Sequence, residues 1–149
     1  MKSTFADLLV GDIVVAVRWD GKDARLLTIT KTKLDLYSGD TRIEFNRSYF
    51  QRVKYINLSG DELRSTYLKT PGGDYLYVSK EEALKFLKEV ESERMDHLLW
   101  TYDKCEKIVS DPNTVPSLRR QEEKTLQGTT KKLLVTEERY KRLYEEIGD

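Results

Sequence analysis

The fold of this chain is decided by the stretch Gly11-Asp12-Ile13-Val14-Val15-Ala16-Val17-Arg18-Trp19 and by the turn signal Asp20-Gly21-Lys22 that follows it. The apolar, β-branched run predicts a strand, and Asp-Gly is a frequent hairpin turn. A second strand is predicted over 24–32, with another turn at Ser38-Gly39-Asp40. Short strands joined by tight turns are typical of a small antiparallel barrel. Such barrels bind partners more often than they catalyse reactions.

Strand and turn signals continue as far as residue 78. Between residues 24 and 36, leucine and isoleucine alternate with polar residues, which is the period of two expected for a half-buried strand. Further strands are predicted at 41–45 and 52–58, and Pro71-Gly72-Gly73-Asp74 separates two β-rich segments. We therefore expect residues 1–78 to form an antiparallel, SH3-like β-barrel, and the chain as a whole to be an α+β protein.

The pattern changes from strands to helices at Ser79. Ser79-Lys80-Glu81-Glu82 is a capping box, which predicts a long helix over 80–109 that ends before Pro112. A helix that is apolar on two sides needs two surfaces to pack against. The two stripes expected here contain Leu84, Leu87, Leu98, Tyr102, Cys105 and Val109 on one side, and Phe86, Val90, His97, Trp100 and Ile108 on the other.

The last part of the chain has a seven-residue repeat. Leucine, tyrosine and isoleucine recur at residues 126, 133, 140 and 147, while Gly128 and Thr136 are potential breaks. We expect two helices, at about 117–127 and 137–147, with one continuous helix as the alternative. Residues 79–149 are thus expected to form a helical region. Its heptads, or the second stripe of the long helix, predict a homodimer.

Composition excludes several classes of protein. Lysine plus arginine number 26 and aspartate plus glutamate also number 26, a balance that argues against indiscriminate coating of DNA. One cysteine rules out an internal disulfide, and one histidine with one cysteine cannot make a zinc site without carboxylates. No cofactor motif is present. Without a signal peptide or an apolar run near twenty residues, we expect a cytoplasmic protein that does not enter membranes.

No set of residues predicts catalysis. His97 has no serine, cysteine or acid placed to complete a site, and Cys105 lies on an apolar stripe where a thiol acts as a small hydrophobe. The chain is therefore expected not to be an enzyme. Tryptophan is enriched at binding hot spots. The residues predicted to bind a protein partner are Trp19, Val90, His97, Trp100 and Ile108.

Nucleic-acid binding is an alternative. Barrels that bind nucleic acid combine lysine and arginine for the phosphates with aromatic rings for the bases. Acidic residues at 35, 40 and 44 dilute the positive charge here, so a solvated outer face is the competing interpretation. The residues involved would be Lys31, Lys33, Arg42, Arg47, Tyr49, Arg52 and Lys54.

Three segments resemble a layout found in small, uncharacterised phage and prophage proteins made of a β-barrel and a helix. They are Val10-Gly11-Asp12-Ile13-Val14, residues 27–34 and Arg42-Ile43-Glu44-Phe45, and the resemblance covers roughly residues 8–110. It implies a phage origin and the cytoplasm of the host. We expect a non-enzymatic accessory protein that binds and inhibits a host protein. The alternatives are a nucleic-acid-binding barrel and a sponge that sequesters a nucleotide signal.

Overall fold

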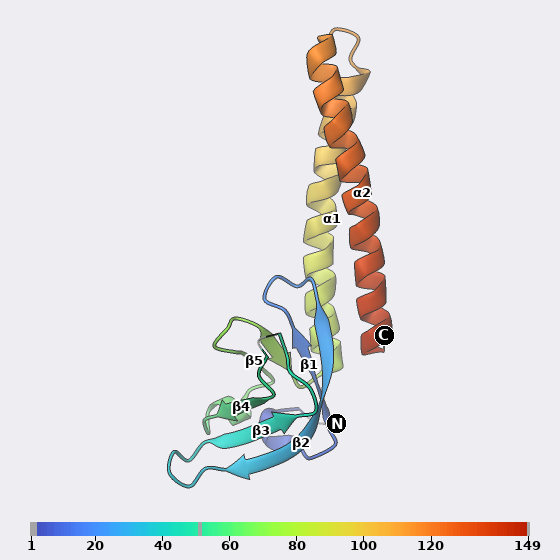
Figure 1. Ribbon diagram of the computed structural model, residues 1–149. Helices are drawn as coiled ribbons and strands as arrows, with labels where there is room; N and C mark the ends of the chain where they lie inside the picture. The colour runs from blue at the N-terminus through green and yellow to red at the C-terminus, as the bar shows by residue number, and fades with distance from the viewer. Residues whose placement is uncertain (1–2, 51, 149) are drawn as a thin grey trace. The chain divides into compact units, whose positions relative to one another are not determined.

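The computed structural model describes residues 3–50 and 52–148 (Figure 1). Two short 3₁₀ turns, η1 (Phe5–Asp7) and η2 (Glu62–Arg64), accompany six strands and two helices. The strands are β1 (Ile13–Val17), β2 (Ala24–Leu34), β3 (Thr41–Phe45), β4 (Tyr55–Leu58), β5 (Tyr67–Lys69) and β6 (Tyr75–Tyr77). The helices are α1 (Lys80–Ser110) and α2 (Pro116–Ile147).

The chain divides into two compact units whose boundaries lie inside the helices. The sheet unit comprises Met1–Phe86 and Leu143–Asp149, and the coiled-coil unit comprises Leu87–Arg142. The sheet unit takes in the first turns of α1 and the last turn of α2.

The sheet unit is an antiparallel sheet that curls into a half-barrel, with the strand order β4-β3-β2-β1-β6-β5. The eleven-residue strand β2 serves both halves, because its first part pairs with β1 and its second part pairs with β3. A register shift between Ile29 and Lys31 lies where the two parts meet. A bulge of this kind bends a strand and increases its twist, which explains the curl.

The expected α+β class is confirmed, and the sheet is barrel-like but open. Among the described residues, the strands β4 and β5 stand at its two edges. They have only four and three residues, and short edge strands limit pairing with other chains. The expected hairpin of 65–69 and 75–78 is present, since β5 pairs with β6 antiparallel from Tyr67↔Tyr77 to Lys69↔Tyr75.

The main core fills the concave side of the curled sheet. It collects inward-facing side chains from all six strands and from the segments around them. Strand β1 is buried on both faces, because Val15 and Val17 are as inaccessible as Val14 and Ala16. On the second face, the Phe86 ring lies 5.2 Å from that of Tyr75 and 6.1 Å from that of Tyr77, between ring centroids.

Helix α1 begins where the capping box predicts it. Ser79 Oγ accepts a hydrogen bond from the Glu82 N–H at 3.4 Å, which satisfies one of the unpaired amides of the first turn. The same hydroxyl donates to the Glu81 carboxylate at 2.8 Å, and this bond keeps the pKa of Glu81 below its usual value. The helix ends at Ser110, one residue beyond the predicted end.

Helix α2 is continuous from Pro116 to Ile147, so the expectation of two helices is wrong and the alternative is correct. Proline is favourable at a first helical position. Gly128 costs about 1 kcal/mol relative to alanine in a helix interior. That cost is offset because the residues on either side of it form one buried stripe at intervals of three and four. The stripe consists of Leu126, Thr129, Leu133, Thr136, Tyr140, Leu143 and Ile147, all buried or half-buried.

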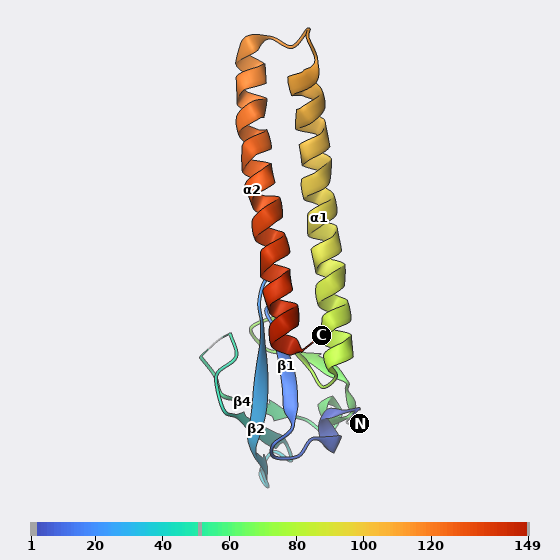
Figure 2. The same ribbon diagram turned by 90° about the vertical axis from the view of Figure 1, so that its right-hand side faces the viewer.

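In the coiled-coil unit, α1 and α2 run antiparallel side by side (Figures 1 and 2). The inner face of α1 has the same spacing, with Leu87, Leu98 and Cys105 buried or half-buried. Repeats of seven are the mark of helices that pack in this way. The heptad residues of α2 in this unit, at 126, 133 and 140, are buried or half-buried. No helix in the described part of the chain has a run long and apolar enough to cross a bilayer.

Candidate functional site

Most of the residues predicted to bind nucleic acid lie along β2, β3 and the segment that joins β3 to β4. Lys33 is paired with Arg42, and Lys31 with Glu44, across the β2–β3 ladder. Paired residues share a face, and this face is opposite to the one that carries Ile43 into the core. We call Lys31, Lys33 and Arg42, together with Tyr55 and Asn57 of β4, the cationic face.

Arg42 is the centre of the cationic face. Its guanidinium carbon lies 3.8 Å from the centroid of the Tyr55 ring, a cation–π contact, and its Nη2 lies 3.5 Å from the Glu44 carboxylate. Both contacts hold the guanidinium beside the Tyr55 ring. Tyr55 is itself 38% exposed, so the ring is open to a partner. The sequence signal for Tyr55 is its alternation, together with Asn57, with the apolar residues Ile56 and Leu58, which places it on the outer face of the strand.

Tyr49 does not belong to this surface. Its ring is 5% exposed, it packs in the main core, and its hydroxyl donates to the Tyr55 carbonyl at 3.2 Å. Burial raises the pKa of this phenol. Tyr49 therefore cannot stack on a base. The exposed aromatic ring beside the cationic residues is that of Tyr55. Arg47, Arg52 and Lys54 are exposed, but they lie in the connection between β3 and β4 rather than in the ladder.

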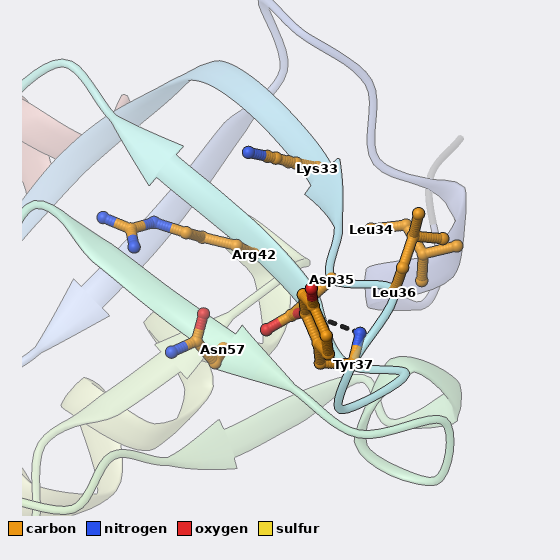
Figure 3. A pocket seen from close by; sticks show the side chains of 7 residues that line it. All are labelled: Lys33, Leu34, Asp35, Leu36, Tyr37, Arg42 and Asn57. Atoms are coloured by element: carbon orange, nitrogen blue, oxygen red, sulfur yellow. Dashed lines mark hydrogen bonds between the residues drawn. The ribbon is translucent and has the colours of Figure 1, made fainter.

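The hairpin that joins β2 to β3 ends in three exposed apolar side chains. Leu34 is 57% exposed, Leu36 is 88% exposed and Tyr37 is fully exposed. We call these three residues the apolar tip. Figure 3 shows Lys33, Arg42 and Asn57 pointing to one side of the hairpin, with Leu34 and Leu36 on the other. A shallow pocket of about 430 Å³ lies where the apolar tip meets the cationic face.

Hydrogen bonds within the turn order the backbone that carries the apolar tip. Asp35 exchanges backbone bonds with its neighbours across the turn: its N–H donates to the Asp40 carbonyl, and its carbonyl accepts from the Gly39 N–H, both at 2.8 Å. The Asp35 carboxylate accepts from the Tyr37 N–H at 2.9 Å. This bond, with a smaller contribution from Ser38, keeps the pKa of Asp35 below its usual value. An ordered tip loses less conformational entropy when it binds.

The residues predicted to bind a protein are divided between the two units. Trp19 is in the sheet unit and 63% exposed, whereas the other four belong to the coiled-coil unit. His97 and Trp100 are both exposed, and their rings stack with centroids 6.5 Å apart. Val90 and Ile108 are half-buried and eighteen positions apart along α1, about 27 Å at the usual helical rise. Of the four residues in the coiled-coil unit, His97 and Trp100 are the two whose rings are in contact.

Cys105 is buried in the coiled-coil unit, at 3% exposure, where its thiol donates to the Glu122 carboxylate at 3.0 Å. The hydrogen bond to Glu122, aided by burial, raises the pKa of the thiol above its usual value of 9.0. The thiol is therefore protonated at neutral pH and is a poor nucleophile. Among the described residues, no three His, Cys, Asp or Glu side chains are grouped so that they could hold a metal ion.

Because the pKa of the Cys105 thiol is raised in the folded protein, the free energy of unfolding should depend on pH through this group. A group whose pKa is higher in the folded state contributes stability that is complete below its unfolded pKa and is lost as the pH rises toward its folded pKa. Wild type should therefore lose stability relative to Cys105→Ala as the pH increases above about 8.5. Urea unfolding of both proteins across this range measures the difference. A difference that stays constant with pH would contradict the assignment.

Comparison of the chain with known protein families, with curated proteins and with solved structures finds no match.

Proposed function

We propose that this is a non-enzymatic binding protein that binds a partner protein through the end of its β2–β3 hairpin. The observation that carries the proposal is the apolar tip. A leucine and a tyrosine that are almost wholly exposed, next to a third apolar residue, form a local apolar surface that water solvates poorly. Tyrosine and arginine are the residue types most enriched at binding hot spots, and Tyr37 and Arg42 border the same shallow pocket.

The two sides of the hairpin indicate the chemistry of the partner. The apolar tip fits a hydrophobic groove, and the cationic face beside it fits carboxylates at the rim of that groove. The resemblance of residues 8–110 to phage proteins supports a host protein as the partner and an accessory, inhibitory role. The curled sheet supports, at a coarser level, the SH3-like barrel expected from the sequence.

The first test removes the apolar tip. Leu36→Ser with Tyr37→Ser should weaken binding of the partner by roughly 30-fold or more, the effect of losing one hot spot of about 2 kcal/mol. The matched control is Leu134→Ser with Val135→Ser, which removes two side chains of α2 that are 62% and 53% exposed. Partners captured from a host lysate by wild type and by each variant are compared by quantitative mass spectrometry.

The partner is the protein retained by wild type and by the α2 control but lost by the tip variant. Its affinity for all three proteins is then measured by calorimetry. A partner that binds the tip variant as tightly as wild type would overturn the proposal. Charge reversal of Lys33 and Arg42 to glutamate should slow association and reduce its dependence on salt, because these side chains steer an acidic partner.

Nucleic-acid binding by the cationic face is the second candidate. Three cations lie on one face of the sheet beside the exposed Tyr55 ring, an arrangement suited to phosphates and a stacked base. Three contacts with single-stranded phosphates predict an affinity that falls roughly 20-fold as salt rises from about 50 to about 200 mM. Fluorescence anisotropy with labelled oligonucleotides measures this. Lys31→Gln, Lys33→Gln and Arg42→Gln together should abolish the binding, and binding that survives this change would exclude the cationic face.

A further inference from the structure

A second pocket lies at one end of the half-barrel, away from the apolar tip. The strand register shows how it forms. Ala16 is paired with Arg25 on one side and with Leu76 on the other, so these three side chains share the inward-facing row. Arg18, Asp23 and Asp74 each lie one residue beyond the end of these strands and two positions from the same row, and all three line the pocket. The apolar core therefore ends in a row of charged side chains, and the pocket of about 370 Å³ opens among them. We call it the mouth pocket.

Two arginines line the mouth pocket with few partners of their own. Arg25 donates from Nη1 to the Ser48 carbonyl at 3.2 Å, and its guanidinium carbon lies 4.9 Å from the centroid of the Phe50 ring. Arg18 is 3.6 Å from the Asp20 carboxylate, beyond the length of a good hydrogen bond. A guanidinium has five N–H donors in one plane. Both groups therefore retain donors for an oxyanion, which arginine binds with two parallel hydrogen bonds.

Acidic and aromatic side chains complete the lining. Asp74 is 2% exposed and accepts a hydrogen bond from the Trp19 N–H at 3.0 Å, so this carboxylate is held in place at the base of the Trp19 side chain. Asp23 lines the pocket as a second carboxylate. The Trp19 ring, 63% exposed, lies at the rim. Gly73, at φ +95°, has Trp19 Cβ 3.8 Å from the place where its own Cβ would be.

We propose that the mouth pocket binds a small molecule that combines an oxyanion, N–H donors and a planar ring. The two guanidinium groups would hold the oxyanion, the two carboxylates would accept from the N–H groups, and Trp19 would stack on the ring. Two arginines and two aspartates balance in charge, which favours a ligand carrying both kinds of group over a simple anion. The volume lies within the range of small-molecule sites, about 300–1,000 Å³. The proposal does not depend on the function of the apolar tip.

Two sources supply this chemistry, a nucleoside monophosphate and an aromatic amino acid. The probes are therefore guanosine monophosphate and L-tryptophan, each titrated into the full chain labelled with ¹⁵N. The chain has two tryptophans, so its spectrum contains two indole N–H signals. Trp19 reports on the mouth pocket, and Trp100, in the coiled-coil unit, is an internal control. We expect one or both probes to shift the Trp19 signal saturably and to leave the Trp100 signal in place.

The matched variants test the arginines. Arg18→Gln with Arg25→Gln should weaken the binding by roughly 10- to 100-fold, the usual effect of losing hydrogen bonds to a charged group. Arg120→Gln with Arg142→Gln removes two exposed arginines of α2 and should leave the affinity unchanged. Binding of one probe alone identifies the source. A Trp19 signal that neither probe shifts at about 5 mM, or binding that the Arg18 and Arg25 changes leave intact, would overturn the proposal.

Discussion

Replacing Tyr140 with alanine is expected to lower the free energy of unfolding by about 3–5 kcal/mol, the usual cost of truncating a buried aromatic side chain. Tyr140 is the largest fully buried side chain among the described residues. Burial raises the pKa of its phenol, and the Arg94 guanidinium opposes this shift. The Ala variant would thus leave both a cavity and a charged group without its phenol partner. Urea unfolding followed by circular dichroism measures the loss, because α1 and α2 provide the helical signal.

Two further variants separate the contributions of Tyr140. Tyr140→Phe keeps the ring and removes the hydroxyl, which is hydrogen-bonded to the Arg94 side chain. This variant should therefore cost about 1.5–3 kcal/mol, the range for a hydrogen bond to a charged group. Leu134→Ala, at a position that is 62% exposed in the same helix, should change stability by less than about 0.5 kcal/mol. A Tyr140→Ala variant as stable as the Leu134→Ala variant would show that the coiled-coil unit does not pack as described.

Leu27→Ala is expected to cost about 2–5 kcal/mol in the sheet unit. Leu27 is completely buried in β2 and is paired with Val14 of β1, so it lies at the centre of the main core. The matched control is Leu34→Ala, because Leu34 belongs to the same strand and is 57% exposed. The control should change the free energy of unfolding by less than about 0.5 kcal/mol. Urea unfolding followed by near-ultraviolet circular dichroism, to which the tyrosines of the sheet contribute, measures both.

The Leu27→Ala and Leu34→Ala variants also separate an effect on folding from an effect on binding. If Leu34 belongs to a docking surface, Leu34→Ala should weaken binding of the partner while leaving the fold intact. Equal destabilisation by the two substitutions would mean that the end of the hairpin is packed rather than exposed. That result would contradict the placement of Leu34 in the apolar tip.

Local patterns in the sequence predict much of the sheet unit. The turn at residues 20–22 and the strand at 41–45 are found where their residue types indicate them. The bulge in β2 also has a counterpart in the sequence. The apolar positions change from odd numbers, at Leu27 and Ile29, to even numbers, at Leu34 and Leu36. A period of two cannot change phase without an extra residue, so this change of phase is a local signal for the bend in the strand.

Exposure of the aromatic residues was harder to predict. Tyr49 stands among basic residues in the sequence and yet its ring is 5% exposed, while Trp100 stands on an expected apolar stripe and is 61% exposed. The pattern of hydrophobic residues predicts whether a segment is a helix or a strand. It does not predict which of two apolar faces of a helix packs against the rest of the molecule. The face of α1 that packs is set by the heptads of α2, and the stripe with His97 and Trp100 falls outside it.

Local patterns along the chain predict the order and type of most of the elements, because hairpin turns, capping boxes and hydrophobic periods are properties of neighbouring residues. Which residues these elements bring together depends on packing between segments that are distant in the sequence. The cationic face requires the register that sets Lys33 beside Arg42, and the mouth pocket requires three strands to bring Arg18, Asp23 and Asp74 into one row. The continuity of α2 through Gly128 also depends on tertiary packing, because the packing of its buried stripe outweighs the low helix propensity of one glycine. These are contacts between distant residues, and no local pattern encodes them.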